Sequence, residues 1–178
     1  MISKKELLSS VNEEVKIIKH LASKLKAKHL KYKPSEKQRT MLELLQYLSY
    51  CGSVATSFVI TGNWDAYPKL SEGSKKINLK NFSAAMDSQM KTIEKLLKGF
   101  NDKDLSTKAT KTPWGSPQKA GLGLANLTLK FLSCYRMQLF LYLKAVGFSE
   151  LSYSNCWLGI DQKPKKAEKP KAKSKAKK

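Results

Sequence analysis

The feature that most constrains this chain is the spacing of its apolar residues, which recur every three or four positions over four long stretches. That period places them on one face of an α-helix, whereas a half-buried strand would alternate at every second position. The stretches cover about residues 3–30, 40–61, 81–100 and 118–146. Four such helices can bury their apolar faces only against one another, which predicts an all-α fold, a four-helix bundle.

Local signals indicate where the first two helices begin and end. Ser3 with Glu6, and Thr40 with Glu43, have the spacing of a capping box, in which two side chains satisfy the first backbone N–H groups of a helix. Pro34 has no backbone N–H and is expected to stop the first helix.

Two connections and a short C-terminal segment complete the predicted body. Residues 62–80 and 101–118 are expected to be loops, the first of them a crossover between parallel or distant helices. Residues 148–161 hold too many aromatic side chains to stay in water and should fold back on the bundle. We therefore divide the chain into a helical bundle over residues 1–161 and a lysine-rich tail over residues 162–178.

The tail is the most basic part of a basic chain. The net charge is +20, of which nine lysines and one glutamate in residues 163–178 contribute +8, and the body carries the other +12. The tail has no apolar side chain larger than alanine, so we expect it to be disordered. Its lysines could bind phosphates by counterion release without recognising sequence, or serve solubility alone. The candidate nucleic-acid contacts are Lys163, Lys165, Lys166, Lys169, Lys171, Lys173, Lys175, Lys177 and Lys178.

Several protein classes are disfavoured by the sequence. Cys51, Cys134 and Cys156 are odd in number and lack C-x-x-C spacing, which argues against a disulfide framework and indicates a reducing, cytoplasmic setting. The N-terminus has no signal-peptide pattern, and the most apolar stretch is too charged to span a bilayer. G-x-S-x-G, phosphate-loop and H-E-x-x-H motifs do not occur.

Over about residues 5–160 the chain resembles the DinB-like (YfiT-like) superfamily of bacterial four-helix bundles. The similarity rests on the capped second helix at residues 40–48, on residues 135–139, and on residues 142–144 followed by Gly147. The resemblance implies a divalent-metal site, often zinc or nickel, held by one histidine on the second helix and two on the fourth. It also implies relatives that are thiol-dependent transferases and isomerases, and it allows a homodimer.

Carried over residue by residue, the resemblance puts Tyr47, Phe131 and Tyr135 at the three histidine positions and keeps a family glutamine as Gln138. Phenylalanine cannot ligate a metal, and a neutral phenol is a poor substitute for the nitrogen and sulfur donors that zinc prefers. We therefore expect that the chain binds no metal at this position and needs no cofactor.

Other residues offer little from which to rebuild a metal site. His20 and His29 are nine residues apart on the predicted first helix and should lie on opposite faces. Cys51 shares a helix face with Tyr47. Cys134, however, is rotated by about 100° around the fourth helix from Tyr135, the neighbouring residue at a metal-ligand position. A two-thiol site therefore has unfavourable geometry, although it stays an alternative.

An aromatic and polar stripe replaces the metal ligands. Phe131, Tyr135, Gln138 and Tyr142 lie at i, i+4, i+7 and i+11 on one face of the fourth helix, and Tyr47 should face them. The stripe is either a buried core with phenol–amide hydrogen bonds, which we favour, or an aromatic pocket for a small organic ligand. The candidate pocket residues are Tyr47, Cys51, Phe131, Tyr135, Gln138 and Tyr142, with Trp114 and Trp157 at the mouth.

Three functions stay open at this point. The favoured one is a metal-free, non-catalytic bundle that binds a small organic molecule or acts structurally. The second is non-specific association with nucleic acid or another polyanion through the tail, and the third is a thiol-dependent transferase with a rebuilt site. The resemblance cannot choose among them, because one fold can host several chemistries.

The replaced ligands lead to a first prediction. The protein should purify without stoichiometric zinc or nickel, whereas the triple variant Tyr47→His/Phe131→His/Tyr135→His should gain metal affinity. Elemental analysis after dialysis measures both. About one metal ion per chain in the unsubstituted protein would contradict the prediction.

Overall fold

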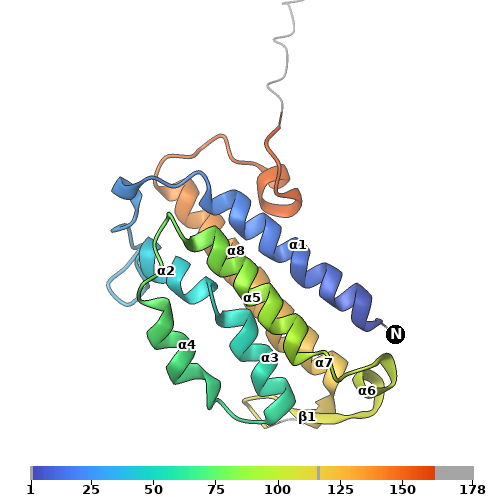
Figure 1. The fold of residues 1–178 in the computed structure, drawn as a ribbon. Coiled ribbons are helices and arrows are strands. Elements are labelled where there is room, and N and C mark those ends of the chain that lie inside the picture. The colour runs from blue at the N-terminus through green and yellow to red at the C-terminus, as the bar shows by residue number, and fades with distance from the viewer. Residues whose placement is uncertain (1, 116, 163–178) are drawn as a thin grey trace, which may run out of the picture.

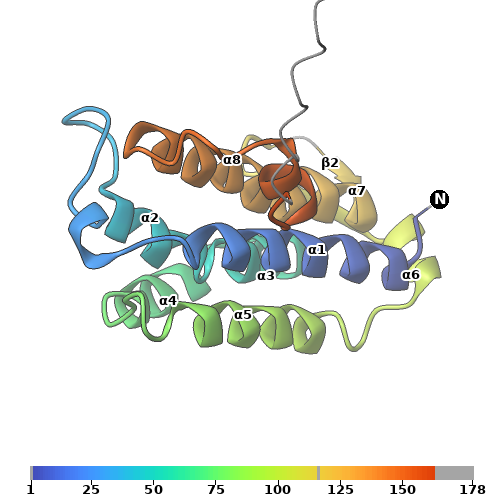
Figure 2. The same cartoon turned by 90° about the horizontal axis from the view of Figure 1, so that it is seen from above.

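Four helical rods run side by side in the computed structural model, which describes residues 2–115 and 117–162 (Figure 1). The rods are α1, α2 continued by α3, α5, and α7 continued by η2 and α8. α1 and α3 each pack against both α5 and α8, so the rods close into the predicted all-α bundle (Figure 2). The element bounds are α1 (Lys4–Ala22), η1 (Ala27–His29), α2 (Met41–Leu48), α3 (Cys51–Thr61), α4 (Ala66–Ser74), α5 (Phe82–Leu96), α6 (Asp102–Thr107), β1 (Ala109–Lys111), β2 (Pro117–Lys119), α7 (Ala120–Leu124), η2 (Ala125–Leu129), α8 (Lys130–Ala145) and η3 (Ser154–Leu158).

The core lies where the apolar faces of the rods meet. Its largest fully buried side chains come from every rod and occupy the periodic positions of the sequence pattern. They are Leu7, Ile18, Leu21, Met41, Leu44, Leu45, Leu48, Met86, Ile93, Leu97, Leu124 and Leu127. Within the described ranges, no helix combines the length and the apolarity needed to cross a membrane. The nine lysines predicted to contact nucleic acid lie outside the described residues.

The first helix is shorter than predicted. Both of its capping-box hydrogen bonds are present, but it ends at Ala22 and Pro34 plays no part in stopping it. Beyond Ala22 the backbone has non-helical partners: the N–H of Lys26 donates to Nδ1 of His29 at 3.1 Å. His29 therefore lies in the η1 turn, not on the first helix where the pattern placed it.

The second rod is two helices instead of the single predicted one, because the chain leaves helical geometry after Leu48. A buried amide on α5 satisfies the backbone at this break. The Oε1 of Gln89 accepts the N–H groups of Gly52 (2.8 Å) and Ser53 (3.2 Å), and its Nε2 donates to the carbonyl of Leu48 (2.9 Å). These are end-of-helix groups that the helices themselves cannot pair.

Both predicted loops contain regular structure. Residues 62–80 hold α4, and residues 101–118 hold α6 and an antiparallel hairpin in which β1 pairs with β2. Only Ser74 of α4 is buried, so this helix lacks the apolar period from which the four rods were predicted. The crossover is thus a thin helical layer lying against α2 and α3 (Figure 1).

The last segment folds back on the bundle as predicted, and a buried ion pair holds it there. The Nε of Arg136 on α8 donates to Glu14 on α1 at 2.6 Å, and Ser133 donates to the same carboxylate at 2.9 Å. The Nη1 of Arg136 also donates to the backbone carbonyl of Cys156 in η3, and Trp157 covers the guanidinium at 5.2 Å. Burying the charged guanidinium of Arg136 without these partners would cost free energy. The contacts therefore hold the last segment, α8 and α1 together.

The helix break leads to a second prediction. Gln89→Leu should lower the free energy of unfolding by at least about 2 kcal/mol, because it leaves buried N–H and C=O groups unpaired at the ends of two helices. Urea denaturation measures the change. Ser83→Ala, on the exposed face of the same helix, is the control and should stay within about 0.5 kcal/mol of the parent protein. An equally small effect of Gln89→Leu would show that the amide is dispensable.

Candidate functional site

A row of aromatic rings crosses from α8 through α2 to α4. Phe131 and Tyr135 have ring centroids 6.3 Å apart, and Tyr135 lies 4.6 Å from Tyr47. The row continues from Tyr47 to Tyr50 at 5.3 Å and from Tyr50 to Tyr67 at 6.1 Å, all in edge-to-face geometry. The structure thus brings together Tyr47, Phe131 and Tyr135, the residues that the family resemblance placed at metal-ligand positions.

The guanidinium of Arg39 lies over this row. Its central carbon is 4.1 Å from the ring centroid of Tyr47 and 5.6 Å from that of Tyr135, within the range of cation–π attraction. The role of Arg39 was not predicted, because this residue precedes α2 and belongs to no helical stripe. A signal was nevertheless present: the chain has 32 lysines and only two arginines. Both arginines, Arg39 and Arg136, lie against aromatic rings, where a planar guanidinium is favoured over an ammonium.

The polar end of the predicted stripe positions Arg39. The Nε2 of Gln138 donates to the hydroxyl of Tyr142 at 2.8 Å, and this hydroxyl donates to the backbone carbonyl of Arg39 at 3.0 Å. Tyr142 is buried, and burial raises the pKa of its phenol. These hydrogen bonds pair the phenol with the amide, and they anchor the residue that covers Tyr47.

A hollow of about 360 Å³ opens between α2, α4 and the loop before α2, next to Tyr47. Three cationic side chains and three phenols contribute to its lining: Lys37, Arg39, Lys75, Tyr47, Tyr50 and Tyr67. The one carboxylate in its wall, that of Glu43, already accepts hydrogen bonds from the backbone and hydroxyl of Thr40 at the start of α2. The balance of charge in the wall is therefore positive.

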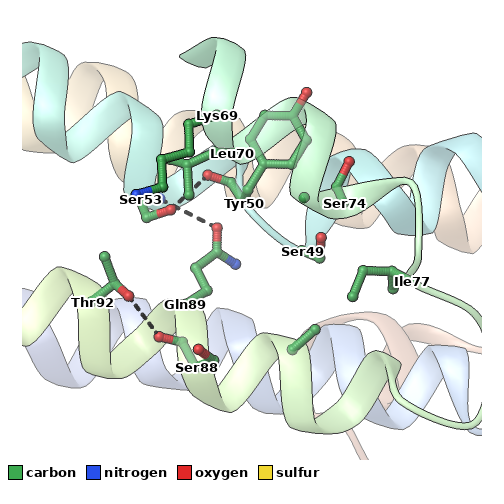
Figure 3. Close-up of a pocket in the computed structure, with 12 residues that line it drawn as sticks. Ser49, Tyr50, Ser53, Lys69, Leu70, Ser74, Ile77, Ser88, Gln89 and Thr92 are labelled. Atoms are coloured by element: carbon green, nitrogen blue, oxygen red, sulfur yellow. Dashed lines mark hydrogen bonds between the residues drawn. The ribbon is translucent and has the colours of Figure 1, made fainter. Parts of the chain in front are cut away.

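A second hollow of about 300 Å³ lies between α3, α4 and α5 around Gln89 (Figure 3). Tyr50 and Ser74 line both hollows, so the two adjoin beneath α4. Half of its lining residues carry hydroxyl groups, although most of its lining surface is apolar. Several of these hydroxyls donate to carbonyls about one turn earlier, as Ser53 does to Tyr50 at 2.9 Å and Thr92 does to Ser88 at 2.9 Å. Lys69 is its one charged lining residue, which makes it far less cationic than the first.

Burial keeps the reactive groups of the site neutral. Burial, and after it the neighbouring Cys51 and Tyr135, raises the pKa of Tyr47 well above its usual value. Burial likewise raises the pKa of the Cys51 thiol to about 12. Near neutral pH Tyr47 is therefore a phenol that can donate its O–H, and Cys51, buried in α3, is a thiol and not a thiolate.

The remaining predicted pocket residues are divided between different places. Gln138 and Tyr142 line a separate hollow of about 430 Å³ on the outer side of α8. Cys51 is fully buried in α3. Trp114 lies on the β1–β2 hairpin and Trp157 lies over Arg136, both more than 60% exposed, and neither lines the hollow beside Tyr47. That expectation was wrong because the segments that carry the tryptophans pack elsewhere on the bundle.

The residues considered for a rebuilt metal site do not converge. His20 contacts Asn155 at 3.2 Å, whereas His29 packs against the ring of Phe148. Cys51 is buried and Cys134 is exposed. In the part of the chain that the structure describes, no three His, Cys, Asp or Glu side chains are grouped as a metal site would need.

Comparison with known proteins establishes the fold. No family model matches the sequence, and no curated protein does. The structure is similar to a DinB-like protein from Bacillus subtilis (TM-score 0.61, 16% identity, 83% of this chain and 96% of that one). It is also similar to a DinB-like protein from Bacillus cereus (0.61, 14%, 82% and 93%) and to a proposed DinB family member from Exiguobacterium sibiricum (0.62, 16%, 83% and 94%). The chain has the DinB-like fold, as the sequence resemblance predicted.

The division of the stripe leads to a third prediction. Tyr142→Phe should lower the free energy of unfolding by roughly 1 kcal/mol or more, because it removes the hydroxyl that pairs with both Gln138 and Arg39. Tyr135→Phe should cost less than about 0.5 kcal/mol, since this ring is half-buried and water can replace its contacts. Two denaturation curves compare them, and the reverse order would mean that Tyr135 belongs to the core.

Proposed function

We propose that this chain, with its DinB-like fold, binds a small organic anion in the hollow between α2 and α4. The observation that supports this most is the guanidinium of Arg39, held over the ring of Tyr47 in the wall of a cationic, phenol-lined hollow. The anion should carry a flat apolar part, because aromatic faces and edges form much of the wall.

The charges of the hollow favour an anion over a neutral ligand. Lys37, Arg39 and Lys75 all line the hollow. Lys75 pairs with Glu72 at 2.6 Å, so Lys37 and Arg39 provide the charge for an anion, whereas Glu43 is engaged in capping α2. A concave wall with one sign of charge focuses the potential and attracts the opposite charge. The planar guanidinium of Arg39 can also form two parallel hydrogen bonds with a carboxylate, which lysine cannot do.

The phenols add hydrogen-bond donors and apolar surface. Burial raises the pKa of both Tyr47 and Tyr50, so both hydroxyls stay protonated and can donate to an anion. A volume of about 360 Å³ is within the range of small-molecule sites. These features support binding without chemistry, since the site offers no activated nucleophile.

The thiol-dependent transferase is the weaker proposal. Its nearest thiol, Cys51, is fully buried and has a pKa of about 12, so it is protonated near neutral pH. Thiolates, not thiols, are the reactive form of cysteine. Non-specific binding of nucleic acid through the tail stays a prediction from the sequence.

The test uses salicylate as the anionic probe and salicylamide as its neutral counterpart. Salicylate should raise the thermal unfolding midpoint, because a ligand that binds only the folded state stabilises it, and salicylamide should have a smaller effect. Arg39→Gln should weaken salicylate binding about tenfold or more, since it removes a charge-assisted hydrogen bond.

Lys16→Gln provides the matched control for that substitution. It also removes one positive charge, but from an exposed position on α1, and salicylate affinity should stay unchanged. Equal affinity of the carboxylate and the amide, equal effects of the two substitutions, or no binding at millimolar probe would each refute the proposed function.

A further inference from the structure

An exposed apolar edge runs along the last turn that the structure describes. Four large apolar side chains within eight residues are between 53% and 65% exposed, whereas three of the four residues between them are buried. These side chains lie in and next to η3, the helical turn over Ser154–Leu158. The exposed residues are Tyr153, Trp157, Leu158 and Ile160, and the buried ones are Ser154, Asn155 and Cys156.

Inward contacts determine which side of this turn faces outward. Besides the bond from Arg136 to the Cys156 carbonyl, the Nδ2 of Asn155 donates to Asp161 at 2.8 Å, and Asp161 pairs with Lys24, which follows the end of α1. Gly159 has φ +64°, and a side chain there would lie 3.2 Å from the backbone of Ile17. The turn therefore packs closely against α1, and these contacts fix its orientation with the apolar edge facing outward.

Strong positive charge follows this edge directly in the sequence. Asp161 is the last acid before the nine lysines of residues 163–178, and Lys24 already balances its charge. We propose that the edge and these lysines together bind the surface of an anionic lipid bilayer. Tyr153 and Trp157 would lie at headgroup level, Leu158 and Ile160 would enter the acyl boundary, and the lysines would attract the anionic headgroups.

The composition of the two parts favours lipid over other occupants. Residues 163–178 cannot cover the edge themselves, because they contain no apolar side chain larger than alanine. A second copy of the chain would bring two segments of charge +8 together, which is repulsive. Nucleic acid would pair with the lysines but would leave Leu158 and Ile160 without a role. Lasting attachment to a membrane surface takes two signals, and an apolar edge beside a polybasic segment supplies both.

The experiment measures sedimentation of the full chain with vesicles of phosphatidylcholine, with and without phosphatidylglycerol. Binding should require phosphatidylglycerol and should weaken with salt, because headgroup attraction is screened. Leu158→Ser/Ile160→Ser should lower the partition coefficient by about tenfold or more, the factor expected for removing buried aliphatic side chains. The matched control is Leu122→Ser/Leu141→Ser, which removes two leucines that are 54% and 56% exposed elsewhere and should leave partitioning unchanged.

A spectroscopic measurement places the edge itself at the lipid. Trp64→Phe/Trp114→Phe leaves Trp157 as the one tryptophan, and its emission should shift to shorter wavelength on addition of phosphatidylglycerol vesicles. Truncation after Gln162 should remove most of the binding while leaving the thermal midpoint unchanged.

Three outcomes would overturn the proposal. One is binding to duplex DNA with no binding to either vesicle. Another is a dimer that Leu158→Ser/Ile160→Ser converts to a monomer without affecting vesicle binding. The third is equal vesicle binding by the two serine double variants.

Discussion

The side-chain amide of Gln89 is the contact on which the shape of the site most depends. By pairing the backbone on both sides of the break after Leu48, it allows the second rod to leave helical geometry inside the bundle. The break places Tyr50 between α2 and α3, where it contacts Tyr47 on one side and Tyr67 of α4 on the other. The two adjoining hollows under α4 meet at this residue, so their position follows from a hydrogen-bond network at a helix end.

Sequence periodicity predicted the parts of this protein that depend on local spacing. The capped starts of α1 and α2 follow from the spacing of the capping-box residues and are present in the structure. The contact of Tyr47 with Tyr135, which the family resemblance implied, is also present. The break in the second rod was missed, because Gln89 lies 41 residues from Leu48 and the apolar positions on both sides still fit one helical period. Pairing across such distances leaves no mark on the local pattern.

The candidate site was predicted in part for the same reason. The predicted stripe is present on α8, but its two ends have different surroundings. Tyr142 is buried and bonded to the backbone of Arg39, whereas Tyr135 is half-buried beneath the Arg39 guanidinium. That division depends on the backbone of Arg39, 103 residues from Tyr142, so no helical wheel could show it. The tryptophans were misplaced because the hairpin and the η3 turn pack according to tertiary contacts, such as the one between Arg136 and Trp157.

The unequal use of arginine and lysine has a consequence for how the protein could be modified. Enzymatic or chemical acetylation neutralises lysine ammonium groups but does not act on guanidinium groups. Heavy acetylation could therefore remove most of the charge of +20, while the two arginines kept their charge and their contacts with aromatic rings. The degree of acetylation would then set how strongly the surface attracts anions. It would not change the charge of Arg39 over Tyr47 or that of Arg136 between α1 and α8.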